Sequence, residues 1–113
     1  MMCLPGYSKN EVILVRYPFS NLSGSKVRPA IVVNDSHISQ DVIIVPLTSK
    51  VLPLMPGEFV LANWKIVGLN VTSAAKRGLY TVHQSLVMKS IGRLSDTDAG
   101  SLERSLRGWL GLP

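Results

Sequence analysis

Two polar residues stand where apolar segments begin and end, and they are the side chains best suited to chemistry in this sequence. Arg28 directly precedes the apolar run "PAIVV" (29–33), and Thr48 directly follows the apolar run "DVIIVPL" (41–47). A guanidinium offers a planar fork of donors and a threonine hydroxyl a short, oriented one, so the two together suit a phosphate. The plainer alternative is that Arg28 forms a surface ion pair and that Thr48 merely ends its strand.

Other catalytic arrangements are not visible. His37 and His83 are the only histidines, each alone in the sequence, and Cys3 is the only cysteine, so neither a metal site nor a disulfide is expected. No glycine-rich phosphate loop and no nucleophile motif occurs, and the acidic residues are scattered. We therefore expect no metal and no cofactor, while a distant pair of histidines acting as acid and base stays open.

The charge balance favours an anionic partner. The sequence has 12 Lys and Arg against 7 Asp and Glu, a net charge of +5. No acidic residue falls between Glu58 and Asp96, and five basic residues lie in that interval: Lys65, Lys76, Arg77, Lys89 and Arg93. This distribution indicates either a nucleic-acid-binding surface or an ordinary solvated basic face.

Length and composition predict one globular domain over residues 1–113. The chain has 113 residues, of which 46% are hydrophobic and 17% charged. Residues 1–9 are expected to form a loose lead-in. The apolar tract "EVILVRY" (11–17) is too short and too charged to cross a bilayer, and no signal peptide precedes it. These features predict a cytoplasmic protein without a membrane partner.

Short β-branched segments predict a small antiparallel sheet or barrel. Residues 11–17, 29–33 and 41–47 are apolar at successive positions and bounded by turn residues, which predicts strands buried on both faces. Weaker strands are expected at 57–61, 79–82 and 69–74. Because no long helix separates the first strands, the expected fold class is mainly β.

The end of the chain predicts one helix packed against this sheet. Ser95 is the expected N-cap, with Asp96 and Asp98 in the first turn. Four apolar side chains then share one helical face: Leu102, Leu106, Trp109 and Leu110. Trp109 and Leu110 either cover the domain's own core or line a contact between subunits.

Four segments, in this order, together resemble the MazF/PemK family of bacterial toxins from about Asn10 to the end. The first, "VILVRYPFSNLSGSKVRPAIVV", has a strand, a polar loop and the Arg-Pro strand, and the second, "VIIVPLTSK", is a strand ending in a Thr-Ser step. The third, "WKIVGLNVTSAAKRGLYTV", has a Gly-Leu step and a serine, and the fourth, "IGRLSDTD", leads into the last helix. Their order and spacing together carry the resemblance.

The resemblance implies a compact barrel, SH3-like or CcdB-like, with a C-terminal helix, and a symmetric homodimer. It also implies the toxin of a type II toxin–antitoxin system. Such a toxin is a metal-independent, sequence-specific endoribonuclease of the mRNA interferase type, which cuts single-stranded RNA to 2′,3′-cyclic phosphate and 5′-hydroxyl ends. A small acidic antitoxin would neutralise it, a partner that suits a basic surface, and the complex with the antitoxin would bind DNA.

By position, Arg28 and Thr48 match the two residues that the family places at the scissile phosphate, so both are expected to be catalytic. The Pro29 strand would hold Arg28, and the loop "SNLSGSK" would be free to close over RNA. Five further side chains are expected to contact RNA: Lys26, Ser49, Lys50, Ser73 and Lys76. Arg28 is a poor general base because a guanidinium stays protonated, so the proton acceptor is not assigned.

The sequence departs from the family in two places. Many members begin the first strand with Gly-Asp, where this chain has Asn10-Glu11. Some carry an acid-Gln pair that helps to read RNA, where this chain has Thr72-Ser73, so their cut-site preference is not transferred. Two further interpretations stay open: a non-nuclease toxin of the same fold that inhibits a protein such as DNA gyrase, and a degenerate member that only binds RNA or an acidic peptide. Arg28 and Thr48 argue against the gyrase interpretation.

Overall fold

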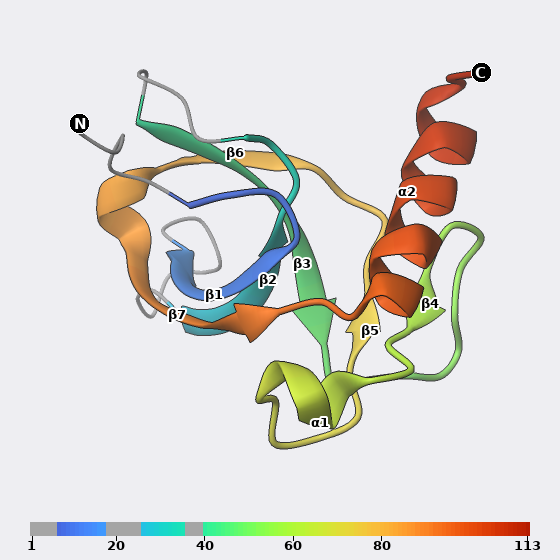
Figure 1. Ribbon diagram of the computed structural model, residues 1–113, viewed down its shortest axis with the longest axis horizontal. Helices are drawn as coiled ribbons and strands as arrows, with labels where there is room; N and C mark the ends of the chain where they lie inside the picture. Colours follow the sequence, from blue (N-terminus) through green and yellow to red (C-terminus); the bar gives the residue numbers. More distant parts are fainter. Residues whose placement is uncertain (1–6, 18–25, 36–39) are drawn as a thin grey trace.

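The computed structural model describes residues 7–17, 26–35 and 40–113. In chain order the elements are β1 (Glu11–Tyr17), β2 (Lys26–Val32), β3 (Asp41–Thr48), β4 (Phe59–Val60), α1 (Trp64–Val67), β5 (Ala74–Ala75), β6 (Tyr80–His83), the 3₁₀-helix η1 (Gln84–Leu86), β7 (Val87–Arg93) and α2 (Asp96–Leu110) (Figure 1). No helix in these ranges is long and apolar enough to span a membrane.

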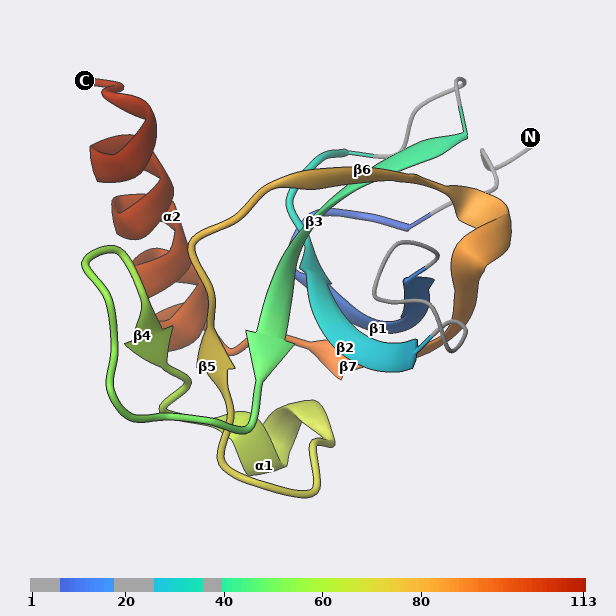
Figure 2. The same cartoon turned by 180° about the vertical axis from the view of Figure 1, so that it is seen from behind.

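The strands form one antiparallel sheet with the order β4-β5-β3-β2-β1-β7, and β6 pairs with β3 beside β5. The sheet curls strongly, so that β1, β2, β3, β6 and β7 surround a common interior (Figure 2). Among the described residues its edges do not pair with one another, so the sheet is barrel-like without being closed. The predicted mainly β fold with a C-terminal helix is confirmed.

The long strands are buried on both faces, as their uninterrupted apolar runs predict. Three successive residues of β2, Ala30–Val32, are fully buried. Ile31 belongs to a core cluster with Leu102 of α2, whereas Ala30 and Val32 belong to a second cluster, with Ile44, inside the curl of the sheet. The two clusters fix β2 and β3 from both sides and leave only the ends of these strands exposed.

Helix α2 begins where the sequence predicts. The Ser95 hydroxyl accepts a hydrogen bond from the Asp98 amide at 3.2 Å, and Gly111 ends the helix with a φ of 71°. Leu102 is buried, but Trp109 and Leu110 are 36% and 50% exposed. The structure thus disagrees with the interpretation that these two residues cover the core, because the last turns of α2 extend past the sheet (Figure 1).

Several element boundaries differ from those expected. β2 begins at Lys26 rather than at residue 29, and β4 is limited to Phe59–Val60. Of the expected strand 69–74, only residue 74 lies in a strand, as the first residue of β5. Neither α1 nor β7 was expected: β7 has no buried residue, and it forms because the free edge of β1 offers it backbone partners.

The start of β1 is held by backbone geometry and by β7. Asn10 has a φ of 73°, in the left-handed region that glycine adopts freely and asparagine tolerates better than most residues. This explains how Asn10 can stand where many family members have glycine. The Arg93 guanidinium donates to the Ser8 hydroxyl at 3.0 Å and to the Lys9 carbonyl at 2.9 Å, which ties residues 8 and 9 to the end of β7.

Candidate active site

The register of the sheet brings Arg28 and Thr48 to the same end of two neighbouring strands. β2 and β3 pair with Val32 opposite Ile44 and with Ala30 opposite Pro46, and Arg28 and Thr48 each lie two residues beyond this last pair. Arg28 is exposed and Thr48 partly exposed, since both lie beyond the buried part of their strands. The two residues singled out as a phosphate-binding pair therefore lie at the same end of two neighbouring strands.

Two prolines open the sheet at this point. Pro46 of β3 and Pro29 of β2 lack the amide hydrogen that a ladder of hydrogen bonds requires. The pairing of β2 with β3 ends at Ala30 and Pro46, so the strands separate just before Arg28. The other side of β3 pairs with β5 up to Leu47–Ala75 and with β6 from Ile44–Tyr80. Between these two pairs, the four residues 76–79 lie opposite only residues 45 and 46 of β3, so they form a bulge.

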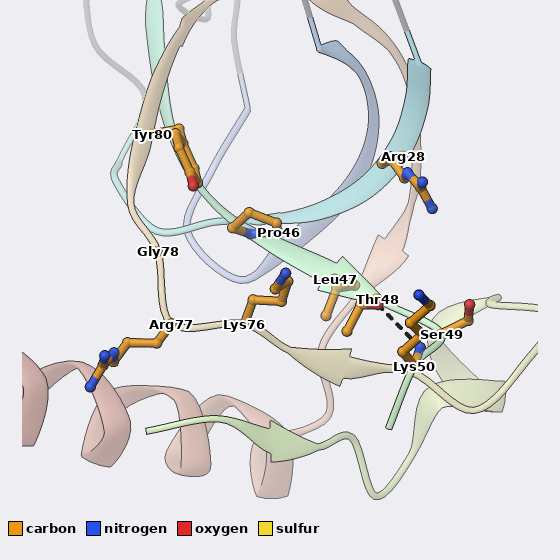
Figure 3. Close-up of a pocket in the computed structure, with 10 residues that line it drawn as sticks. All are labelled: Arg28, Pro46, Leu47, Thr48, Ser49, Lys50, Lys76, Arg77, Gly78 and Tyr80. Atoms are coloured by element: carbon orange, nitrogen blue, oxygen red, sulfur yellow. Dashed lines mark hydrogen bonds between the residues drawn. The ribbon is translucent and has the colours of Figure 1, made fainter. Parts of the chain in front are cut away.

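A pocket of about 480 Å³ occupies the space between the separated strands and the bulge (Figure 3). We call it the Arg28 pocket, and the described residues that line it are Arg28, Pro46, Leu47, Thr48, Ser49, Lys50, Lys76, Arg77, Gly78 and Tyr80. Four of these side chains are cationic and none is acidic, so the pocket suits an anion. It brings together five of the seven predicted site residues.

The Thr48 hydroxyl is oriented by its own chain. It accepts a hydrogen bond from the Lys50 amide at 3.1 Å, in a local turn that fixes the position of the hydroxyl oxygen (Figure 3). This bond uses the oxygen as an acceptor, so the hydroxyl can still donate. In Figure 3 the Lys50 side chain extends toward Arg28, whereas the Lys76 side chain lies on the other side of β3, beside Pro46.

Glu58 holds the bulge that carries Lys76 and Arg77. Its carboxylate accepts hydrogen bonds from the Met55 amide at 2.9 Å and from the Arg77 amide at 3.4 Å. The hydrogen bond from the Met55 amide is the main cause of the lowered pKa of Glu58, and the charges of Lys76 and Arg77 lower this pKa further. The bulge is thus attached to the segment before β4 by a residue outside the pocket.

Arg77 and Tyr80 line the Arg28 pocket although sequence reasoning did not assign them to the site. The tyrosine ring lies close to the backbone of Gly78, where a β-carbon would come within 3.0 Å of the ring. An aromatic residue close in sequence to Lys76 and Arg77 is a combination typical of RNA-binding surfaces. That combination was the available signal for Tyr80.

A second hollow lies on the other side of Arg28. This groove, about 500 Å³ in volume, shares Arg28, Leu47 and Ser49 with the Arg28 pocket and is also lined by Asn70, Ser73, Lys89 and Ser90. Ser73 is 3% exposed and its hydroxyl donates to the Val71 carbonyl at 3.0 Å. Lys26 lines neither hollow, although it lies on β2 near Arg28.

Of the two histidines, the structure describes only His83, and it does not line this pocket. His83 is exposed, and its Nδ1 accepts a hydrogen bond from the Ser85 amide at 3.1 Å at the start of η1. Across the described ranges, no three His, Cys, Asp or Glu side chains gather as metal ligands would. Cys3, His37 and residues 18–25, which hold most of the "SNLSGSK" loop, lie outside the described residues.

Solved structures with the same fold cover almost the whole chain. An endoribonuclease from a mycobacterial species in complex with its cognate antitoxin has a TM-score of 0.74 at 15% identity, over 96% of this chain and 97% of that one. The Mycobacterium tuberculosis toxin MazF-mt6 has a TM-score of 0.71 at 18% identity, over 91% and 98%. MazF in the MazE-MazF complex from Deinococcus radiodurans has a TM-score of 0.73 at 14% identity, over 98% and 100%.

The family itself follows from the sequence match. No curated protein matches the chain. A family model described as "PemK-like, MazF-like toxin of type II toxin-antitoxin system" matches residues 8–110, and this confirms the family expected from the four segments. Since the match includes the Arg28 pocket and nearly the entire chain, the protein belongs to the PemK-like, MazF-like toxins of type II toxin–antitoxin systems.

Proposed function

We propose that this protein is a metal-independent, sequence-specific endoribonuclease that cuts single-stranded RNA to 2′,3′-cyclic phosphate and 5′-hydroxyl ends. The observation that supports this most is the Arg28 pocket, in which Arg28 and Thr48 line the same hollow as Lys50, Lys76 and Arg77, with no acidic residue in its described lining. Single-stranded RNA suits such a site, because unpaired bases can be splayed out while the backbone is held.

The proposed reaction is an attack by a ribose 2′-hydroxyl on the adjacent phosphate. The 2′-oxygen forms a bond to phosphorus, and the bond between phosphorus and the 5′-oxygen of the next nucleotide breaks. The proton of the 2′-hydroxyl is lost and the departing 5′-oxygen gains one, so the reaction consumes no water. The described lining of the pocket holds neither a carboxylate nor an imidazole, and for this reason its main contribution is stabilisation of charge.

Arg28 and Thr48 supply this stabilisation in different ways. The guanidinium presents two parallel donors to the phosphoryl oxygens, and the Thr48 hydroxyl, oriented by the Lys50 amide, presents one. Placed donors of this kind contribute roughly 3 to 4 kcal/mol each to a transition state that develops negative charge. Ser49, Lys50 and Lys76 contact the neighbouring phosphates and sugars, as does Lys26 at the edge of the site. Ser73 is too buried to contact RNA directly and instead supports the wall of the second hollow.

The family suggests the partners of this activity. The mycobacterial endoribonuclease was solved with its cognate antitoxin, and MazF of Deinococcus radiodurans with MazE. We propose that this toxin acts in the cytoplasm as a homodimer and is neutralised by a small acidic antitoxin. A pocket with four cationic side chains offers an acidic segment a complementary surface.

The test is cleavage of a long, structurally defined RNA by purified protein in EDTA. Primer extension maps the ends, and kinase labelling tests for 5′-hydroxyls. Arg28→Ala and Thr48→Ala should each lower kcat by about a hundredfold or more. The exposed residues Arg107 and Thr97 on α2 provide matched controls, and Arg107→Ala and Thr97→Ala should cleave like wild type.

The result also distinguishes the other interpretations. Discrete cuts that are lost in both pocket variants and kept in both controls support the nuclease. If folded wild-type protein leaves varied RNAs intact in EDTA, or if Arg28→Ala cleaves normally, the proposal is wrong. Inhibition of DNA gyrase by such an inactive protein would then support a toxin that acts by binding a protein target.

A further inference from the structure

A separate pocket lies between the C-terminal helix and the segment before β4. It measures about 500 Å³, and its lining includes Gly57, Arg77, Arg104, Ser105, Gly108 and Trp109. We call it the Trp109 pocket. Ser105 and Gly57 join its two walls, since the Ser105 hydroxyl donates to the Gly57 carbonyl. None of the residues predicted from the sequence as site residues lines this pocket.

The lining combines an aromatic face with two guanidinium groups. The guanidinium carbon of Arg77 lies 5.9 Å from the centre of the Trp109 ring, and Trp109 is 36% exposed. Arg104 donates to the Ser101 hydroxyl at 3.3 Å, and neither arginine forms an ion pair with a described acidic residue. An indole and a guanidinium plane stack on nucleic-acid bases, and an unpaired arginine binds phosphate, so this lining suits one nucleotide.

Arg77 connects this pocket to the proposed catalytic site. It lines both the Arg28 pocket and the Trp109 pocket, and in Figure 3 its side chain extends from the bulge toward α2. We propose that the Trp109 pocket is a second RNA subsite, in which a base flanking the cleavage site stacks on Trp109 and Arg77 while Arg104 binds the adjacent phosphate. This inference rests on the proposed function, because the RNA that binds here is the strand that the Arg28 pocket would cleave.

The open space around Gly108 allows a charge to be added to the Trp109 pocket without disturbing the fold. A β-carbon built on Gly108 meets nothing within 4 Å, so a side chain there projects into open space without displacing a neighbour. Gly108→Glu adds a negative charge to the lining, and Gly108→Gln adds the same bulk without the charge. Both replacements favour the helix over glycine, so neither variant should fail to fold.

Binding is measured with tryptophan fluorescence. Trp64 and Trp109 are the only tryptophans, so Trp64→Phe leaves Trp109 as the single reporter. This protein is titrated with a random pool of 12-nucleotide single-stranded RNA whose 2′-hydroxyls are methylated, so that it cannot be cleaved. Stacking on Trp109 predicts saturable quenching of the fluorescence. A length-matched poly-glutamate serves as the competing anion, and it should quench far less than the RNA.

Affinity is then compared between variants with a labelled sample of the same RNA. Trp109→Ala should raise Kd roughly 5- to 100-fold, the range for losing one stacked base. Arg104→Gln should weaken binding and lower the slope of log Kd against log salt by about 0.7, the value for one phosphate contact on a single strand. Arg107→Gln removes an equal charge from α2 outside the pocket and should leave the Kd and the slope unchanged. Gly108→Glu should bind more weakly than Gly108→Gln.

The outcomes separate this inference from the proposed function. If the protein cleaves RNA in EDTA but RNA does not quench Trp109, the subsite is overturned and the nuclease stands. The same holds if Arg104→Gln and Arg107→Gln change the Kd for RNA equally. Specific quenching without cleavage supports the subsite and contradicts the nuclease. Equal quenching by poly-glutamate overturns the RNA subsite, because the pocket would then take an acidic peptide.

Discussion

Asp98 links helix α2 to the segment before α1, and its removal should be among the most destabilising single changes in the protein. Its side chain is 1% exposed. The carboxylate accepts hydrogen bonds from the Ala62 amide at 2.7 Å and from the Asn63 amide at 2.9 Å. Asp98→Ala removes the acceptor of both and leaves two amide hydrogens without a partner in a partly buried place.

The expected cost follows from these two contacts. A hydrogen bond to a charged group contributes about 1.5 to 3 kcal/mol, and an amide left unsatisfied costs a similar amount. Two such bonds give about 3 kcal/mol if water reaches the freed amides, and up to about 6 kcal/mol if it does not. Because a domain is stable by only about 5 to 15 kcal/mol, Asp98→Ala should remove a large share of the free energy of unfolding.

The assay is urea unfolding followed by circular dichroism, with Asp96→Ala as the matched control. Asp96 lies in the same first turn of α2 but is exposed, so its loss affects only the interaction with the helix dipole, about 0.3 to 1 kcal/mol. Asp98→Asn keeps one carbonyl acceptor and should fall between the two. If Asp98→Ala costs no more than Asp96→Ala, the reasoning about these buried contacts is refuted.

Two further predictions concern the walls of the Arg28 pocket. The pKa of Glu58 is lowered from its usual value of 4.5, so its carboxylate stabilises the folded state above about pH 4.5 and loses this effect as the pH falls further. Glu58→Gln should therefore lower the urea midpoint more at pH 7 than near pH 3, and an equal loss at both would contradict this. Gly78→Ala places a β-carbon 3.0 Å from the Tyr80 ring and should lower kcat/KM for RNA by up to about a hundredfold with little change in stability. Unchanged kinetics would show that the position of this ring is unimportant.

The sequence predicted well the parts of the fold that depend on local patterns. Uninterrupted apolar runs identified β1 and β3, since strands buried on both faces need apolar residues at every position. Ser95 and Asp98 marked the start of α2, because capping requires particular residue types at fixed spacing. Arg28 and Thr48 stood out because a guanidinium and a hydroxyl at the ends of strands can together hold a phosphate.

What escaped prediction depends on contacts between distant segments. The sequence "VMKSIGR" of β7 does not alternate between apolar and polar residues, so it does not predict a strand. It is a strand only because β1 provides backbone partners. Gly92 illustrates the same dependence, since a β-carbon there would lie 2.1 Å from the Val67 carbonyl oxygen. Gly92 is needed because β7 and α1 approach closely, and the local sequence does not predict that approach.

The site divides in the same way. The residue types that can hold a phosphate are visible in the sequence, since Arg28 and Thr48 carry their chemistry wherever they lie. That they line the same pocket depends on the register of β2 and β3. The buried faces of both strands impose that register, because a slip of one residue would turn every core side chain outward. Arg77 and Tyr80 join the pocket through the bulge opposite Pro46, where a missing amide hydrogen interrupts the ladder. The composition of the pocket is thus a consequence of strand pairing, which only the folded chain establishes.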